Sequence, residues 1–169
     1  MLALLLGLVL IGWLWVNRHS YGAAAFDAAE QARLAQKNAS VALAALKADF
    51  TAQDLTSVLN MNVINFASGS AQIPSESYDF LNHAAAALKK APAGTVLEVA
   101  SHTDSTGDQE SNWELSRLRA NTVREYLIGQ GVDPNELQAT GYGESKPVAT
   151  NDTEEGRFRN RRLEFTVLK

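Results

Sequence analysis

Short strand-like and longer helix-like segments alternate between residues 62 and 168, and this alternation limits the possible folds more than any other feature of the chain. In the last strand-like segment, Leu163, Phe165 and Val167 recur at every second position, as in a half-buried strand. Chains that alternate in this way form an α/β sheet with parallel pairs and crossover helices packed on it. The predicted strands cover residues 62–66, 95–102, 137–142 and 162–168, and the predicted helices cover residues 74–90 and 110–130.

Both predicted helices carry an apolar stripe that is suited to packing on a sheet. The first stripe consists of Tyr78, Leu81, Ala85 and Leu88, and the second of Ala120, Val123 and Leu127. Pro92 and Gly94 follow the first helix, and Gly129 and Gly131 mark the end of the second. The pattern therefore predicts two helices that bury one face each.

Four polar motifs follow one another between Ser101 and Arg162. The first, SHTD, comes at the end of a predicted strand, and the second, NWELSRLRA, begins at Asn112 inside a predicted helix. The third is GYGE from Gly141, followed by Pro147, and the fourth is NDTEEGRFRNRR from Asn151. Together these motifs resemble the OmpA-like peptidoglycan-binding domain, over roughly residues 60–169. The resemblance implies a mixed four-stranded sheet (α+β) whose last strand is antiparallel.

Two positions depart from the pattern of that family. Ser101 stands where the family often has glycine before His-Thr-Asp, and Ala67 stands where it often has aspartate after the first strand. We expect the first departure to alter the loop geometry slightly. The second puts a side-chain contact from the first loop in doubt.

A carboxylate and a guanidinium are expected at one crevice. Asp104 follows a predicted strand, and Arg119 lies in the next helix. Ligands of α/β units bind outside the carboxyl ends of the strands, so the two side chains should approach the same pocket. Arginine presents a planar fork to a carboxylate, and aspartate accepts from an ammonium, so the pair suits a zwitterion. The alternative is a salt bridge that only ties the loop to the helix.

The resemblance assigns roles to these residues. It implies that Asp104 and Arg119 bind the diaminopimelate of the wall peptide stem. Asn112 is expected to cap its helix, since asparagine is a good N-cap. The other residues expected at this peptidoglycan site are Thr103, Leu115, Ser116, Asn160 and Arg161.

Composition excludes several other classes of function. The chain contains no cysteine, so thiol nucleophiles, zinc–thiolate sites and the acylation site of a bacterial lipoprotein are excluded. The net charge of −4 argues against a nucleic-acid partner, despite the four arginines near the C-terminus. His102 and Asp104 lack a third zinc ligand. We find no nucleophile motif or phosphate-binding loop. We therefore expect a protein that is not an enzyme and needs no cofactor.

The N-terminal segment is expected to reach a membrane. Residues 1–16 carry no charge and end near Trp13 and Trp15. Such a segment would form a helix of about 24 Å, slightly short of a bilayer core. We predict a transmembrane anchor over residues 1–22. A cleaved signal segment, with Ala23-Ala24-Ala25 at the cleavage site, and a buried core helix are the alternatives.

An alanine-rich stretch joins this segment to the domain. We predict a helical linker over residues 23–56 and the folded domain over residues 57–169. The linker is either a spacer between membrane and wall or a helix folded against the domain, where Leu43, Leu46 and Phe50 would dock. We expect an inner-membrane protein whose C-terminal domain holds peptidoglycan in the periplasm, alone or within a larger envelope complex. Arg18, placed after the apolar run, opposes this orientation by the positive-inside rule.

Overall fold

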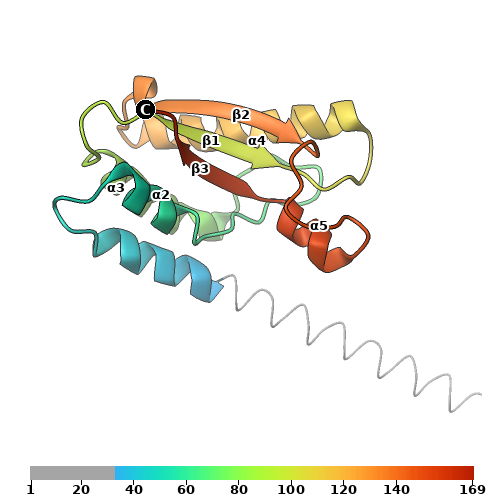
Figure 1. Cartoon of the computed structure of the whole chain (residues 1–169), viewed down its shortest axis with the longest axis horizontal. Coiled ribbons are helices and arrows are strands. Elements are labelled where there is room, and N and C mark those ends of the chain that lie inside the picture. Colours follow the sequence, from blue (N-terminus) through green and yellow to red (C-terminus); the bar gives the residue numbers. More distant parts are fainter. Residues whose placement is uncertain (1–32) are drawn as a thin grey trace, which may run out of the picture. The chain divides into compact units, whose positions relative to one another are not determined.

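A three-stranded mixed sheet organises the structure (Figure 1). The computed structural model describes residues 33–169, of which Ala35–Lys169 form a compact unit. The sheet has the order β2-β1-β3, with β1 parallel to β2 and antiparallel to β3. This confirms the predicted mixed sheet with an antiparallel last strand. Its strands are β1 (Leu97–His102), β2 (Leu137–Gly143) and β3 (Leu163–Val167).

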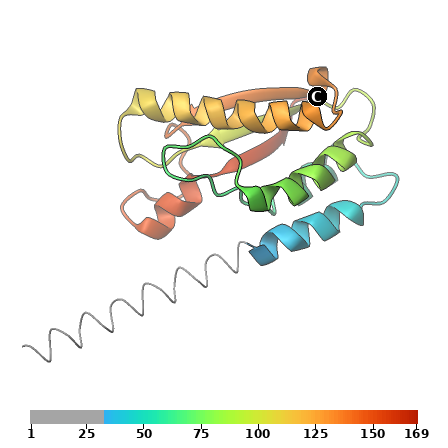
Figure 2. The same ribbon diagram turned by 180° about the vertical axis from the view of Figure 1, so that it is seen from behind.

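Helices cover one face of this sheet, as Figure 2 shows. Helix α4 (Gln109–Gly129) packs on β2 and β1, and α3 (Tyr78–Leu88) lies beside α4. The close contact between α4 and β2 needs Gly141, because a Cβ at this position would lie 2.2 Å from the backbone nitrogen of Arg117. The buried face of α4 includes Ala120, Val123 and Leu127, as predicted.

The expected fourth strand at residues 62–66 is not formed. This segment connects α2 (Ala52–Leu59) to α3 and forms no ladder of backbone hydrogen bonds with the sheet. At the free edge of β3, the side chain of Asn60 takes the place of a strand. Its Nδ2 donates to the oxygen of Phe165 at 2.9 Å, and its Oδ1 accepts from the nitrogen of Phe165 at 2.7 Å. Those two backbone groups would otherwise pair with a neighbouring strand.

Two helical details differ from the prediction. A 3-10 turn at Ser75–Ser77 precedes α3, so the α-helix starts four residues later than the predicted start at residue 74. On this helix Phe80 is buried, whereas Tyr78 is 37% exposed and does not belong to the buried stripe that the sequence predicted. The sequence also did not predict α5 (Glu154–Asn160), whose first turn is capped by Thr153 through the nitrogen of Gly156.

The C-terminal part of the predicted linker packs on the domain. Residues 33–44 are helical, and Ala39 and Leu43 are buried in the same apolar core as α2, α3 and the sheet. Thus the docked alternative describes residues 35–44. The predicted helical linker is interrupted after them, because residues 45–50 are turns and irregular chain before α2 begins. The predicted domain boundary at residue 57 falls inside α2.

The predicted membrane anchor at residues 1–22 lies outside the described residues. Within residues 33–169, no helix is both long and apolar enough to cross a membrane.

Candidate functional site

An open groove of about 870 Å³ lies where β1 ends. The first turns of α4, the loop at residues 66–69, the loop after β1 and the helix α5 surround it. Six of the eight predicted site residues belong to its lining, namely Thr103, Asp104, Asn112, Leu115, Arg119 and Arg161. The crevice outside the carboxyl end of a strand is therefore present where the sequence predicted it.

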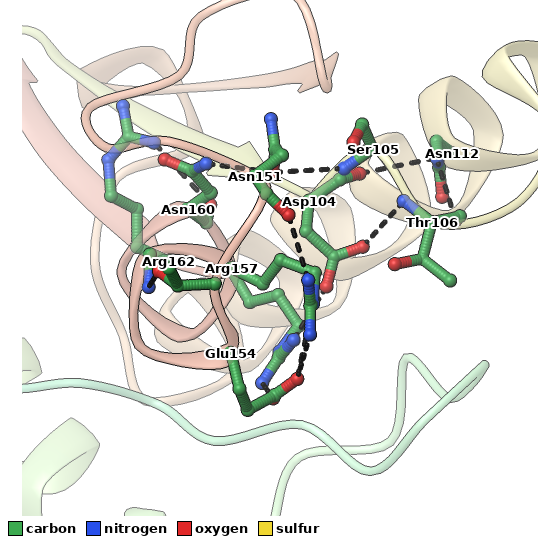
Figure 3. Close-up of polar contacts among 12 residues, drawn as sticks. Asp104, Ser105, Thr106, Asn112, Asn151, Glu154, Arg157, Asn160 and Arg162 are labelled. Carbon is green, nitrogen blue, oxygen red and sulfur yellow. Dashed lines mark hydrogen bonds and ion pairs between the residues drawn. The ribbon is translucent and has the colours of Figure 1, made fainter.

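Asp104 is held in its ionised form at the floor of the groove. Its Oδ1 accepts from the backbone nitrogen of Thr106 at 2.9 Å, and its Oδ2 accepts from Nη1 of Arg161 at 2.6 Å. Burial disfavours the charge, but the hydrogen bonds from Arg161 and Thr106 outweigh it and lower the pKa of Asp104. Figure 3 shows that the carboxylate of Asp104 points away from Asn112 and toward Glu154.

Arg161 bridges two carboxylates across the groove. In addition to Asp104, its Nη2 donates to Oε1 of Glu154 at 2.8 Å. Burial opposes the charge of Arg161, and the two carboxylates more than compensate, so its pKa is raised. Hence Asp104 forms its ion pair with Arg161. The alternative from the sequence, a salt bridge between Asp104 and Arg119, is not formed in the described part of the chain.

Arg119 is 5% exposed and holds the loop at residues 67–70. Its Nε donates to the oxygen of Ser70 at 2.8 Å, its Nη2 donates to the oxygen of Ala67 at 3.0 Å, and the guanidinium lies 5.0 Å from the centre of the Phe66 ring. This loop contacts Arg119 through backbone carbonyls, so the contact needs no aspartate at position 67. Burial and the nearby charge of Arg161 lower the pKa of Arg119.

The groove combines the carboxylate of Asp104, which is paired with Arg161, with the guanidinium of Arg119, which keeps a free hydrogen-bond donor. Among residues 33–169, Nη1 of Arg119 makes no hydrogen bond. A ligand carboxylate can take that donor, and a ligand ammonium can share Asp104 with Arg161. The hydroxyl of Thr103 is also buried with no partner among the described residues. Unpaired buried groups cost stability, so a groove that contains them is suited to a polar ligand.

Asn112 supports the loop after β1, and its predicted role as a helix cap is wrong. Its Nδ2 donates to the oxygens of Asp104 and Thr106 and to Oε2 of Glu144, at 3.3, 3.1 and 2.8 Å. The helix cap is Asp108, whose side chain accepts from the nitrogen of Ser111 at 3.0 Å. Asp108 lies four positions before Asn112 and suits the cap better, because its backbone is extended directly before the helix begins.

Ser116 and Asn160 do not reach the groove. Ser116 is completely buried, and its Oγ accepts from the nitrogen of Gly143 at 2.8 Å, which ties α4 to the end of β2. Asn160 is also completely buried, and its side chain closes the loop at residues 148–151. Both act as structural supports of the elements that carry the site.

Sequence reasoning missed Glu154, Arg157 and Phe66 as lining residues. Arg157 donates Nη1 to the oxygen of Asn151 at 2.8 Å and pairs with Glu154, so the start of α5 becomes one wall. Thr153 followed by Glu154 and Glu155 is a helix-start pattern that could have revealed α5 and its acidic first turn.

Comparison with known proteins agrees with this geometry. The OmpA family matches residues 65–161, and the chain belongs to that family. It is 40% identical to the "Probable lipoprotein YiaD" of Escherichia coli (strain K12) over 65% of this chain and 50% of that protein. It is 37% identical to the peptidoglycan-binding protein ArfA of Mycobacterium tuberculosis (strain H37Rv), over 68% of this chain and 36% of that protein. The match therefore spans half or less of these two relatives.

A solved structure shows the same fold. The cell wall anchor of the T6SS from Pseudomonas aeruginosa superimposes with a TM-score of 0.54 and 38% identity, over 60% of this chain and 73% of that one.

Proposed function

We propose that this protein binds cell-wall peptidoglycan without catalysis, through the diaminopimelate of the peptide stem. The observation that carries the proposal is that Asp104 and Arg119 line one groove. Within residues 33–169, one donor of Arg119 and the hydroxyl of Thr103 have no hydrogen-bond partner. Membership of the OmpA family and the likeness to a peptidoglycan-binding protein and to a cell wall anchor support it. None of the three similar proteins named above bears the name of an enzyme.

The chemistry of diaminopimelate matches the charges of the groove. The free end of this residue carries both an ammonium and a carboxylate. The ammonium would donate to the carboxylate of Asp104, which also accepts from Arg161, and the carboxylate of the ligand would accept from the guanidinium of Arg119. A lysine in the same position of the stem has the ammonium but no second carboxylate. We therefore propose that Arg119 distinguishes diaminopimelate-type walls from lysine-type walls.

The proposed location follows from the ligand. We propose that residues 1–22 anchor the chain in the inner membrane and that the domain from residue 57 onward lies in the periplasm, where it meets the wall. Residues 23–56 would connect the two, although residues 35–44 pack on the domain and so shorten the free spacer. Protease accessibility from the periplasmic side tests this orientation. A domain digested only from the cytoplasmic side contradicts it.

The decisive experiment compares two stem peptides and two variants. Isothermal titration calorimetry on the full chain in detergent is expected to show tight binding of a diaminopimelate tripeptide and weak binding of the lysine tripeptide. Asp104→Ala and Arg119→Ala should each lose about 2–5 kcal/mol of binding free energy, because a desolvated charge loses its partner. Their sedimentation with purified sacculi should fall accordingly, while circular dichroism shows that they remain folded. Wild-type binding by both folded variants would refute the site.

A second candidate is a structural subunit of a larger envelope assembly, in which the domain serves as the wall anchor. The likeness to the cell wall anchor of the T6SS favours it. Crosslinking followed by purification from membranes tests this candidate. A stable stoichiometric complex supports it, and a chain recovered alone with the sacculi opposes it.

A further inference from the structure

A cavity separate from the groove lies between α3 and the C-terminal end of the helix at residues 33–44. Its volume is about 650 Å³, and it has no lining residue in common with the groove. Residues 43–50 of the linker line one side, and α3 with the turn after it lines the other. Figure 2 shows the two helices side by side, and Leu43 packs in the same core as α3. The linker and the domain therefore form this cavity together.

The interior of the cavity is apolar. Leu43, Leu46 and Phe50 line it from the linker, and Ala87 lines it from α3. Leu43 and Ala87 are buried, while Leu46 and Phe50 are half-buried and pack against the same core. The remaining apolar lining residues are alanines, which leave the space open. Cavities of about 300–1,000 Å³ with mostly apolar walls and a few polar groups are typical of sites for small molecules.

Basic side chains line the exposed edge of the cavity. Lys47 and Lys90 belong to its lining and are exposed, and neither forms an ion pair within residues 33–169. His83 also lines the cavity, but its Nδ1 lies 3.7 Å from Oδ2 of Asp79. The exposed Asp49 belongs to the turn beside Lys47 and is not a lining residue. Two ammonium groups without a carboxylate partner in the described chain therefore lie at the edge of an apolar space.

We propose that this cavity binds a fatty acid, with the acyl chain between the linker and α3 and the carboxylate at Lys47 and Lys90. At about 30 Å³ for each water-sized group, the cavity has room for roughly 20 such groups, which is the size of one long acyl chain. A phospholipid has two such chains and would exceed this volume. The paired lysines complement an anionic head group, whereas a neutral amphiphile would leave them without a partner.

This site is distant from the groove and does not depend on wall binding. Lys89, next to Lys90, donates Nζ to the oxygen of Gln130 at 3.0 Å, at the C-terminal end of α4. Leu115 lines the groove near the other end of α4, about 22 Å away along the helix axis. The two sites can therefore be occupied at the same time. Because the linker forms one wall, a bound fatty acid would also stabilise the packing of residues 43–50 on the domain.

Photolabelling of the full chain in phosphatidylcholine nanodiscs tests the proposal. The probe is a diazirine derivative of dodecanoic acid, used under conditions in which the acid is ionised, and mass spectrometry locates the labelled residues. Label is expected in residues 43–50 and 83–90, which line the two sides of the cavity. Unlabelled dodecanoate should compete about tenfold better than dodecanol, because only the acid pairs with the two exposed lysines.

Three variants separate the roles of charge and space. The double variant Lys47→Gln with Lys90→Gln should lose the tenfold advantage of dodecanoate over dodecanol, because the chain still enters but the carboxylate has no partner. Lys37→Gln is the matched control, because Lys37 is an exposed lysine on the linker helix outside the lining, and it should behave as the wild type. Ala86→Trp fills the cavity from an exposed position of α3 and should abolish the label on both sides.

The outcomes are distinct from those of the wall-binding experiment. Equal labelling of the wild type and of Ala86→Trp, or equal competition by dodecanoate and dodecanol, overturns the proposal. Loss of the label when phosphatidylglycerol is added to the discs overturns it in favour of a bilayer phospholipid. All these variants should sediment with sacculi as the wild type does, so a chain that takes up the label but does not bind sacculi refutes only the proposed wall binding.

Discussion

Two clusters of buried polar side chains lie near the carboxyl end of β1, and they satisfy their polar atoms differently. In the first, Asn160 is completely buried and all sides of its amide are paired. Its Oδ1 accepts from the nitrogens of Val148 and Ala149, and its Nδ2 donates to the oxygen of Ala149 and to Oδ1 of Asn151, at distances of 2.9–3.0 Å. The figure of the site shows Asn160 and Asn151 side by side (Figure 3).

In the second cluster, His102 and Thr103 are nearly as buried, but their side chains have no hydrogen-bond partner among the described residues. Thr103 borders the groove, and the ring of His102 stacks on Tyr142 at 5.2 Å. The contrast separates buried polar side chains that stabilise the fold through internal hydrogen bonds from those whose polar atoms are left free for a ligand. A fully paired group stabilises the folded chain, whereas an unpaired one costs stability and is useful only if binding completes it.

The largest effect is expected for Asn160→Ala. This change leaves two backbone N–H groups and one carbonyl of the loop at residues 148–151 without their partner, so we expect a loss of about 4 kcal/mol in the free energy of unfolding. Urea denaturation followed by circular dichroism measures it. Asn135→Ala is the matched control, because Asn135 is exposed and, in the part of the chain that the structure describes, its side chain bonds only to Asp133. It should change stability by about 0.5 kcal/mol or less. Equal losses of stability in the two variants would contradict the structural role of the Asn160 hydrogen bonds.

A smaller effect is expected for His102 and depends on pH. Its folded pKa of about 4 lies below the unfolded value near 6.5, so the unfolded chain binds more protons between these values. Stability contributed by the neutral ring is complete above about pH 6.5 and is lost as the pH falls toward 4, by about 3 kcal/mol in total.

The measurement is a series of urea denaturation curves between pH 7 and pH 4.5, for the wild type and for His102→Phe. The variant keeps a ring to stack on Tyr142 but cannot take up a proton. Its stability should therefore fall less steeply with acid than that of the wild type. Parallel pH profiles would show that His102 is not buried in an unpaired state in solution.

The smallest effect, and the one that sharpens the comparison most, is expected for Thr103→Val. Valine has the shape of threonine without the unpaired hydroxyl, so stability should stay the same or rise by about 1 kcal/mol. Binding of the diaminopimelate tripeptide should weaken by about 1 kcal/mol, roughly fivefold, if the hydroxyl bonds to the ligand.

Thr56→Val is the matched control for this prediction. Thr56 is buried to a similar degree, but its Oγ1 donates to the oxygen of Gln53 at 3.2 Å. We expect this variant to lose about 1 kcal/mol of stability and to bind the tripeptide normally. A destabilised Thr103→Val protein with normal binding would place Thr103 among the structural residues.

Much of the fold could be predicted because it depends on local patterns. The alternation in β3, the apolar stripe of α4 and the glycines at its C-terminal end are each features of one local segment. The fourth strand could not be judged in this way. Residues 62–66 have strand-like composition, but whether they pair depends on the edge of β3, which the side chain of Asn60 occupies across 105 positions of sequence.

The candidate site likewise has features that the sequence predicts and features that depend on the tertiary structure. The sequence by itself determined that Asp104 would follow a strand and Arg119 would lie in the next helix, since both positions result from short-range patterning. Only the tertiary structure decided that Asp104 pairs with Arg161, that Arg119 holds the carbonyls of Ala67 and Ser70, and that Asn160 closes a loop. Hydrogen-bond partners depend on angstrom-scale distances between segments far apart in the chain, and those distances exist only after the core has packed.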